Sequence, residues 1–159
     1  GQYPPEHLFG RRLLTIATAT YATEDYLEAH SLIEGDIRKG QSDQHKTAQW
    51  IGFGSRKPNP IWRKKSKYPH LPIKGKFDSL LLQVEACKAG MGLAMLPCFL
   101  GDKEPSLKRL SEPELKPNFD LWILTHKDLR TTARFRILTD HIAASFRKNR
   151  EVYEGISRE

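Results

Sequence analysis

The chain has 159 residues, a hydrophobic content of 38%, a charged content of 28% and a formal net charge of +7. This length suits one domain with a substantial core, and no apolar run approaches the roughly 20 residues of a transmembrane helix. No cationic start followed by an apolar segment indicates secretion, and the two cysteines, Cys87 and Cys98, lack CxxC spacing. We therefore expect a cytoplasmic protein with buried thiols and no membrane contact.

The first third of the chain contains two predicted strands and one predicted helix. Residues 13–20 (LLTIATAT) alternate and are rich in β-branched side chains, which favours a strand. Thr23 is a suitable N-cap for a short helix over residues 24–30, which begins with two acidic side chains. Residues 31–47 show no firm periodicity, and residues 48–53 (AQWIGF) predict a second strand.

Two short strands and a helix are predicted towards the centre of the chain. Residues 61–63 favour one strand, and residues 72–77 (PIKGKF) alternate and lead directly to Ser79. Ser79 is a candidate N-cap, and Gly90 can take the left-handed conformation that ends a helix. The residues between them repeat at helical spacing, with a predicted buried stripe that contains Leu80, Leu81, Val84 and Cys87.

A buried strand is expected directly after this helix. Residues 91–96 (MGLAML) are apolar and uncharged, and Pro97 suits the first turn of a following helix. Strand, helix and strand in succession predict a βαβ crossover with a parallel sheet, whose ligands lie beyond the carboxyl ends of the strands. The free amides after Ser79 then favour a carboxylate or phosphate, although a simple helix cap is the alternative for Ser79.

The last third predicts two strands and a long helix. Residues 106–110 favour an edge strand, and Pro113 and Pro117 bracket a predicted loop. Residues 119–125 (FDLWILT) are rich in aromatic and β-branched side chains and favour a strong strand. Asp128 is a candidate N-cap for a helix over roughly residues 130–148. Its expected apolar stripe contains Phe135, Leu138, Ile142 and Phe146. The charged residues from Glu151 onwards are expected to fray.

Catalytic and metal-binding patterns are weak in this sequence. Cys98, His126 and Asp128 have the residue types of a nucleophile, a base and an orienting group, but no nucleophile-elbow spacing accompanies them. The six histidines lie far apart, and there is no phosphate-binding glycine loop. We therefore expect no enzyme, no metal and no cofactor. The positive charge suits nucleic acid, but a solvated basic surface is the simpler interpretation.

Three blocks of the sequence resemble LysR-type transcriptional regulators. Residues 84–102 (VEACKAGMGLAMLPCFLGD) resemble the "EA…AG.G.A.LP" signature of the effector-binding domain in that family. Residues 119–142 (FDLWILTHKDLRTTARFRILTDHI) resemble its "LWLLTHPDLR…ARVR" ending. Residues 4–27 (PPEHLFGRRLLTIATATYATEDYL) resemble the segment that leads into its second lobe. The blocks occur in the family's order and span residues 4–147.

The resemblance implies an α/β fold of the periplasmic-binding-protein-like type 2 class. It implies one lobe with a mainly parallel sheet flanked by helices, and an incomplete first lobe. Residues 1–20 are then the crossover from lobe one, and residues 21–118 the second lobe. Residues 119–150 are the return strand and C-terminal helix of lobe one, and residues 151–159 a frayed tail. The helix-turn-helix domain and the first half of lobe one that such regulators carry have no counterpart in these residues.

The resemblance also implies a sensing function. A small, anionic effector is expected in a cleft between the lobes, with Ser79 binding the anion through its hydroxyl and the helix amides. Phe53, Gly54 and Pro97 are expected as wall contacts, with the core as the alternative for Phe53, and Thr125 as a hinge-side contact. Self-association to a dimer or tetramer is expected, and DNA contact only through the absent helix-turn-helix domain. An assembly module without its own ligand and a solute-binding protein are the alternatives.

Overall fold

The computed structural model describes residues 5–6, 8–32, 47–54, 60–129 and 132–156. They form two compact units, and the chain passes between the units several times. Unit 1 takes its described residues from 1–18, 97–99 and 113–159, and unit 2 from 19–96 and 100–112. Strand β1 (Leu8–Thr23) contributes to both units, because its residues up to Thr18 belong to unit 1 and the rest to unit 2.

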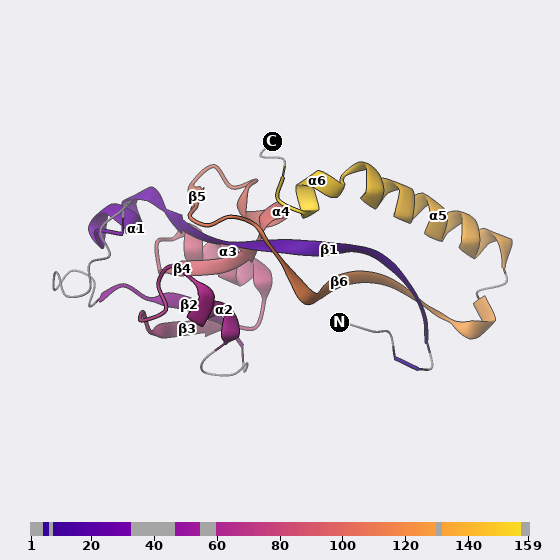
Figure 1. Cartoon of the computed structure of the whole chain (residues 1–159), viewed down its shortest axis with the longest axis horizontal. Helices are drawn as coiled ribbons and strands as arrows, with labels where there is room; N and C mark the ends of the chain where they lie inside the picture. Colours follow the sequence, from indigo (N-terminus) through magenta and orange to yellow (C-terminus); the bar gives the residue numbers. More distant parts are fainter. Residues whose placement is uncertain (1–4, 7, 33–46, 55–59, 130–131, 157–159) are drawn as a thin grey trace. The chain divides into compact units, whose positions relative to one another are not determined.

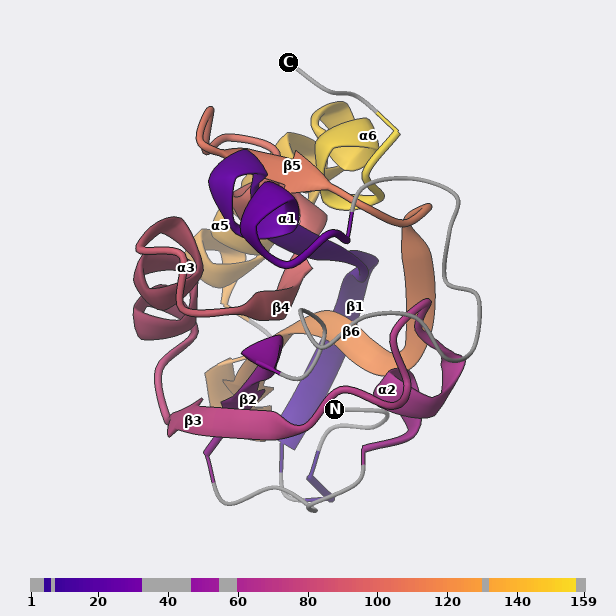
Figure 2. The same ribbon diagram turned by 90° about the vertical axis from the view of Figure 1, so that its left-hand side faces the viewer.

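Unit 2 is an α/β layer (Figures 1 and 2). After β1 its elements are α1 (Glu24–Ala29), β2 (Trp50–Phe53), α2 (Ile61–Lys65), β3 (Ile73–Phe77), α3 (Leu80–Lys88), β4 (Leu93–Pro97), α4 (Cys98–Gly101) and β5 (Leu107–Arg109). The last residue of β4 and the first two of α4, residues 97–99, belong to unit 1. The strands follow the order β3-β2-β4-β1-β5. Strand β2 is parallel to both β3 and β4, whereas β1 and β5 run antiparallel to each other. Figure 2 shows β3, β2 and β4 one above another, with α3 to one side of them.

The predicted βαβ arrangement is confirmed, since β3, α3 and β4 follow one another and both strands run parallel to β2. Strand β4 is buried at four of its five positions, as expected for a strand covered on both faces. The strand predicted at residues 61–63 is wrong. These residues lie in helix α2, because Pro60 stands at its N-cap and its carbonyl oxygen accepts a hydrogen bond of 3.1 Å from the Arg63 amide.

The two predicted N-caps of unit 2 differ in their side-chain bonding. Thr23 caps α1 as predicted, and its Oγ1 accepts a hydrogen bond of 3.3 Å from the Tyr26 amide. Ser79 stands at the N-cap of α3, but its side chain makes no cap hydrogen bond. The predicted buried stripe of α3 is wrong at Leu81, which is 66% exposed, while Gln83 is buried. Because leucine fills three successive positions at the start of α3, their spacing alone does not define a buried face.

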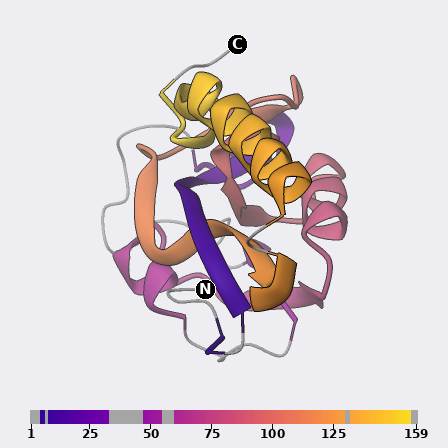
Figure 3. The same ribbon diagram turned by 90° about the vertical axis from the view of Figure 1, so that its right-hand side faces the viewer.

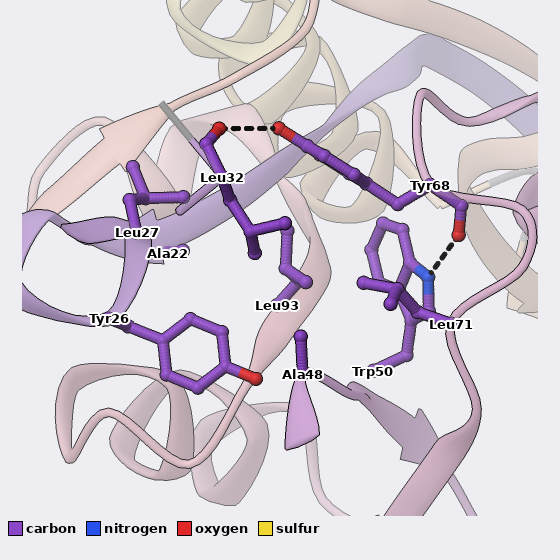
Figure 4. Packing of buried hydrophobic residues seen from close by; sticks show 9 residues of the cluster. All are labelled: Ala22, Tyr26, Leu27, Leu32, Ala48, Trp50, Tyr68, Leu71 and Leu93. Atoms are coloured by element: carbon purple, nitrogen blue, oxygen red, sulfur yellow. Dashed lines mark hydrogen bonds between the residues drawn. The ribbon is translucent and has the colours of Figure 1, made fainter. Parts of the chain in front are cut away.

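An aromatic cluster lies in the core of unit 2 (Figure 4). Trp50 is fully buried at its centre, where its Nε1 donates a hydrogen bond of 2.9 Å to the Tyr68 carbonyl oxygen. The Tyr68 hydroxyl donates one of 3.1 Å to the carbonyl oxygen of Leu32, which follows α1. Buried polar groups need such partners, so these two bonds tie the segment after α2 to β2 and to the end of α1. The cluster comprises Ala22, Tyr26, Leu27, Leu32, Ala48, Trp50, Tyr68, Leu71 and Leu93.

Unit 1 is built on the pairing of β1 with β6. Its further elements are β6 (Glu114–His126), a 3-10 turn (Lys127–Leu129), α5 (Ala133–Lys148) and α6 (Arg150–Tyr153). Strands β1 and β6 are antiparallel, and α5 lies to one side of this pair (Figures 1 and 3). An ion pair of 2.6 Å between Arg11 in β1 and Asp140 joins the strand to α5.

Three predictions for unit 1 are wrong in detail. Strand β6 begins at Glu114, so the predicted loop between Pro113 and Pro117 is a strand with an irregular register. Strand β6 pairs with β1 alone, and a proline is tolerated on such an edge strand. Thr132, not Asp128, stands at the N-cap of α5, because Asp128 lies in the separate 3-10 turn. Arg150–Tyr153 form helix α6 where fraying was predicted, and the Tyr153 ring lies 5.2 Å from Phe99 and 5.0 Å from Phe146.

The two units differ in how much apolar surface they bury. Among the described residues of unit 1, the buried hydrophobic side chains are Leu14, Ala17, Cys98 and Ala143. The large hydrophobic residues that unit 1 exposes are Phe9, Leu115, Phe119, Leu124, Leu129, Ile137, Leu138 and Ile156. The stripe predicted for α5 is therefore wrong at Leu138, which is 53% exposed. No helix in the described part of the chain is long and apolar enough to cross a membrane.

Candidate effector site

Three of the five residues predicted to bind an effector lie together in unit 2. Phe53 ends β2 and is the register partner of Phe77, which ends the parallel strand β3. The Gly54 amide donates a hydrogen bond of 2.9 Å to the Phe77 carbonyl oxygen. Ser79 follows two residues later and stands at the N-cap of α3. We call these residues, 53–54 and 77–79, the α3 entry. They stand at the carboxyl ends of two parallel strands, where open α/β sheets bind ligands.

The backbone of the α3 entry is shaped by Gly54. Its φ of +39° lies in the left-handed region, which non-glycine residues adopt only with strain. The Asp78 carboxylate occupies the space that a Cβ on Gly54 would need. Because Gly54 has no side chain, the segments after β2 and after β3 can lie directly against each other.

The start of α3 offers hydrogen-bond donors. The first-turn amides of a helix have no partner within the helix, and the positive end of its dipole favours an anion. The Ser79 hydroxyl makes no cap hydrogen bond to these amides, while the Ser79 carbonyl oxygen accepts one of 3.1 Å from the Gln83 amide. Helix α3 thus begins with amide groups that its own N-cap side chain leaves unsatisfied.

Sequence reasoning missed two features of the α3 entry. The first is Asp78, which is exposed and places a carboxylate beside Ser79 and Gly54. The second is the pair Leu81 and Leu82, exposed by 66% and 55%, which provides apolar surface next to Ser79. The α3 entry and the first turn of α3 therefore present first-turn amides, one negative side chain and two exposed leucines. The closeness of Asp78 to Gly54 is visible only in the folded structure, where the two segments meet.

The other two predicted site residues belong to unit 1. Pro97 is buried at the end of β4, and Thr125 lies in β6 opposite Phe9. The Thr125 hydroxyl donates a hydrogen bond of 3.3 Å to the His126 carbonyl oxygen. Both therefore lie in the unit that does not contain the α3 entry, and their wall and hinge roles stay predictions.

The residues considered for catalysis do not present an accessible nucleophile. Cys98 is fully buried, whereas His126 and Asp128 are exposed. A Cβ placed on Gly155 would lie 2.8 Å from the Cys98 sulfur, so the residues after α6 pack closely over this thiol. Burial also raises the pKa of Cys87 to about 12. In the part of the chain that the structure describes, no three His, Cys, Asp or Glu side chains are grouped to hold a metal ion.

Comparison with known proteins finds similarity to solved structures. Neither a protein-family model nor a curated protein sequence matches the chain. The chain is similar to the AmpR effector-binding domain from Citrobacter freundii, with a TM-score of 0.66 and 14% identity over 91% of this chain and 70% of that one. It is also similar to the regulatory domain of CrgA, a LysR-type transcriptional regulator from Neisseria meningitidis. The TM-score is 0.62, with 19% identity over 87% of this chain and 69% of that one.

A full-length regulator extends the comparison. LysG from Corynebacterium glutamicum, solved with bound effector Arg, matches with a TM-score of 0.57 and 18% identity over 90% of this chain and 48% of that one. At identities below 20% these matches show the fold. The chain has the α/β, periplasmic-binding-protein-like fold of LysR effector-binding domains, which confirms the fold that the sequence motifs predicted. The matched domains belong to transcriptional regulators and not to enzymes.

Proposed function

We propose that this chain is the ligand-sensing part of a LysR-type transcriptional regulator. A small effector that carries a carboxylate binds at the α3 entry, and its binding changes how the full-length protein regulates transcription through its DNA-binding domain. Binding can shift the regulator only if the effector prefers one of its conformations. The motif blocks, the fold and the LysR-type neighbours support this function.

The observation that carries the proposal is the geometry of the α3 entry. Parallel strands β2 and β3 end side by side, Gly54 donates to the Phe77 carbonyl oxygen at 2.9 Å, and the N-cap of α3 follows two residues later. The helix amides suit a carboxylate, and the Ser79 hydroxyl makes no cap bond that would compete for them. Leu81 and Leu82 are exposed beside them and suit an apolar part of the ligand.

Asp78 narrows the class of effector. A second negative charge next to the carboxylate site disfavours a purely anionic ligand, because like charges repel at short range. An effector with both a carboxylate and an ammonium group avoids this repulsion, since the ammonium group can approach Asp78. Amino acids have this pair of groups, and the neighbour LysG was solved with bound effector Arg. Pro97 and Thr125 stay predicted as further contacts, together with a cleft between lobes.

A thermal-shift screen of the whole chain tests this function. The panel pairs amino acids, arginine among them, with the matching acids that lack the amino group, and adds phosphate and sulfate. We expect a saturable rise in Tm with an amino acid and a smaller one with its des-amino partner, since a ligand that binds only the folded state stabilises it. Ser79→Trp should abolish the rise. Asp78→Asn should remove the preference for the amino group and serves as the matched control.

Absence of any shift in a folded sample, or equal shifts in wild type and Ser79→Trp, would contradict a site at the α3 entry. If an amino acid and its des-amino partner raised the Tm of the wild type equally, only the proposed role of Asp78 would be contradicted, and the site itself would stand.

A second candidate function is self-association without a ligand, which the exposed apolar surface of unit 1 favours. Ile137 and Leu138 of α5 are 70% and 53% exposed, and large exposed apolar patches mark interaction sites. In this case we expect the mass measured by light scattering to rise with protein concentration. Ile137→Lys with Leu138→Lys should return the chain to a monomer. A monomer at every concentration tested would exclude this candidate.

A further inference from the structure

One segment of the chain is strongly and uniformly basic. Residues 44–77 contain nine lysines and arginines and no acidic residue, so this segment more than accounts for the net charge of +7. Its described part includes helix α2, the turn after it and strand β3. In Figure 2, α2 lies to the right of β3, and the turn after α2 joins the two elements. Five of its lysines are exposed: Lys64, Lys65, Lys67, Lys74 and Lys76. We call these five lysines the α2–β3 basic surface.

Four acidic residues of unit 2 pair with cations outside this surface. Glu85 and Glu104 each pair with Lys88 at 3.0 Å, and Asp102 pairs with Arg109 at 3.1 Å. Glu24 pairs with Lys108 at 3.1 Å. Within the described ranges, by contrast, the five lysines of the α2–β3 basic surface form no ion pair. No ion pair within the described part of unit 2 therefore offsets the positive charge of this surface.

Two structural explanations cover only part of this pattern. Strand β3 ends the strand order, and exposed lysines on an edge strand prevent pairing with another chain. That reason fits Lys74 and Lys76. Cations in the last turn suit a helix dipole, but α2 has only five residues and Lys67 lies beyond its C-cap. Neither reason requires five exposed lysines over a helix, a turn and a strand that follow one another in the chain.

We propose that the α2–β3 basic surface binds the phosphate backbone of double-stranded DNA without reading its sequence. Binding to the backbone needs unpaired cations and gains from the release of counterions. Single-stranded nucleic acid would need exposed aromatic rings for stacking, but Tyr68 is buried and Trp62 packs against the core cluster. A membrane surface would need an apolar face, and Ile61 is the one large exposed hydrophobic residue of α2.

This contact is separate from the proposed effector site and from any DNA-binding domain. In a regulator whose own DNA-binding domain holds a specific site, such a surface on the sensing part would hold flanking DNA in a sequence-independent way. Each lysine that contacts a phosphate adds about 0.9 to the magnitude of the salt slope, so five contacts give a slope of roughly −4 to −5.

Fluorescence anisotropy with a labelled DNA duplex of arbitrary sequence, titrated with the whole chain at several salt concentrations, tests the proposal. The test variant carries Lys64→Gln, Lys65→Gln and Lys67→Gln. The control carries Arg134→Gln, Arg147→Gln and Lys148→Gln on α5, whose side chains are also exposed, so both variants lose the same net charge. We expect the test variant to bind at least about tenfold more weakly at low salt and its slope to fall by about 3, and the control to change little. Unchanged circular dichroism and Tm show that both variants fold.

Three outcomes would overturn the proposal. The first is no binding of duplex DNA by the wild-type chain at low salt. The second is an equal loss of affinity in both variants, which would mean that net charge alone attracts the DNA. The third is that vesicles containing phosphatidylserine bind the wild-type chain more tightly than DNA does, with the loss again confined to the test variant. The α2–β3 basic surface would then be a membrane-binding surface.

Discussion

At the scale of single residues, Gly54 gives the sharpest prediction. Gly54→Ala should destabilise the protein by more than about 1–2 kcal/mol, because alanine at a φ of +39° is strained and its Cβ meets the Asp78 carboxylate. Gly75 is the matched control, since its φ is +71° but a Cβ there would meet only Phe77, at 3.8 Å. Gly75→Ala should therefore lose only the free energy that alanine costs at a positive φ, about 1 kcal/mol. Urea unfolding of the two variants measures the difference.

The double variant Gly54→Ala with Asp78→Ala separates the two causes at this position. In the double variant the new Cβ no longer meets a carboxylate, so the loss of unfolding free energy should be smaller than in Gly54→Ala and close to that of Gly75→Ala. Equal losses for Gly54→Ala and Gly75→Ala would mean that Asp78 does not press on this glycine.

Asp120 in unit 1 gives a pH-dependent prediction. Its Oδ1 accepts hydrogen bonds of 2.6 Å from the Thr15 hydroxyl and 2.9 Å from the Arg12 Nε. Both bonds lower the pKa of Asp120 below its ordinary value of 3.8, and the bond from Thr15 has the larger effect. A carboxylate with a lowered pKa in the folded state adds stability above its ordinary pKa, and this is lost as the pH falls through the lowered value. Because Arg12 is half-exposed, the contribution at neutral pH is below about 1 kcal/mol.

Asp120→Asn should therefore cause a small loss of stability at pH 7 and none at low pH. Urea unfolding between pH 2 and pH 7 measures this. Asp128→Asn, which removes an exposed charge from the same unit, controls for the change in net charge. A loss in Asp120→Asn that is constant with pH would point to altered packing and not to the ionised carboxylate.

At the scale of elements, the two N-caps of unit 2 make a matched pair. Thr23→Ala should cost about 1 kcal/mol, because the Thr23 side chain accepts the Tyr26 amide hydrogen bond. Ser79→Ala should cost well under half of that, since the Ser79 side chain makes no cap bond. Urea unfolding followed by circular dichroism compares the two variants. An equal loss in both would mean that the Ser79 hydroxyl does cap α3 in solution.

The positions of helices and strands were easier to predict than which of their sides are buried. Strands β1, β2, β3 and β4 and helices α1, α3 and α5 lie where alternation, caps and helical spacing predicted them, with ends displaced by a few residues. Helix α2 was missed because three residues of apolar and basic type carry no period, and the effect of Pro60 on them is local. The exposed side of α3 was missed because Leu80, Leu81 and Leu82 make every direction of its first turn apolar.

At the scale of the whole molecule, the two thiols report on the two units separately. Cys87 belongs to unit 2 and Cys98 to unit 1, and both are fully buried. We expect neither to react with a thiol reagent in the native state. On addition of urea, Cys98 should react first, because few apolar side chains are buried in the described part of unit 1 and local stability follows such burial.

The variants Cys87→Ala and Cys98→Ala, each with one remaining thiol, assign the reaction to its unit. Simultaneous reaction of both thiols across the urea range would mean that the units unfold as one. Earlier reaction of Cys87 would mean that the large aromatic core does not make unit 2 the more stable one.

The sequence by itself determined the fold of this protein and part of its candidate site. Caps, glycines and hydrophobic periods are local signals, and the order of three motif blocks indicated the LysR-like fold, which the solved structures confirm. The tertiary structure alone placed Asp78 against Gly54 and exposed Leu81 and Leu82. These features depend on which segments meet after folding. Contacts between residues distant in the chain leave no periodic trace in the sequence.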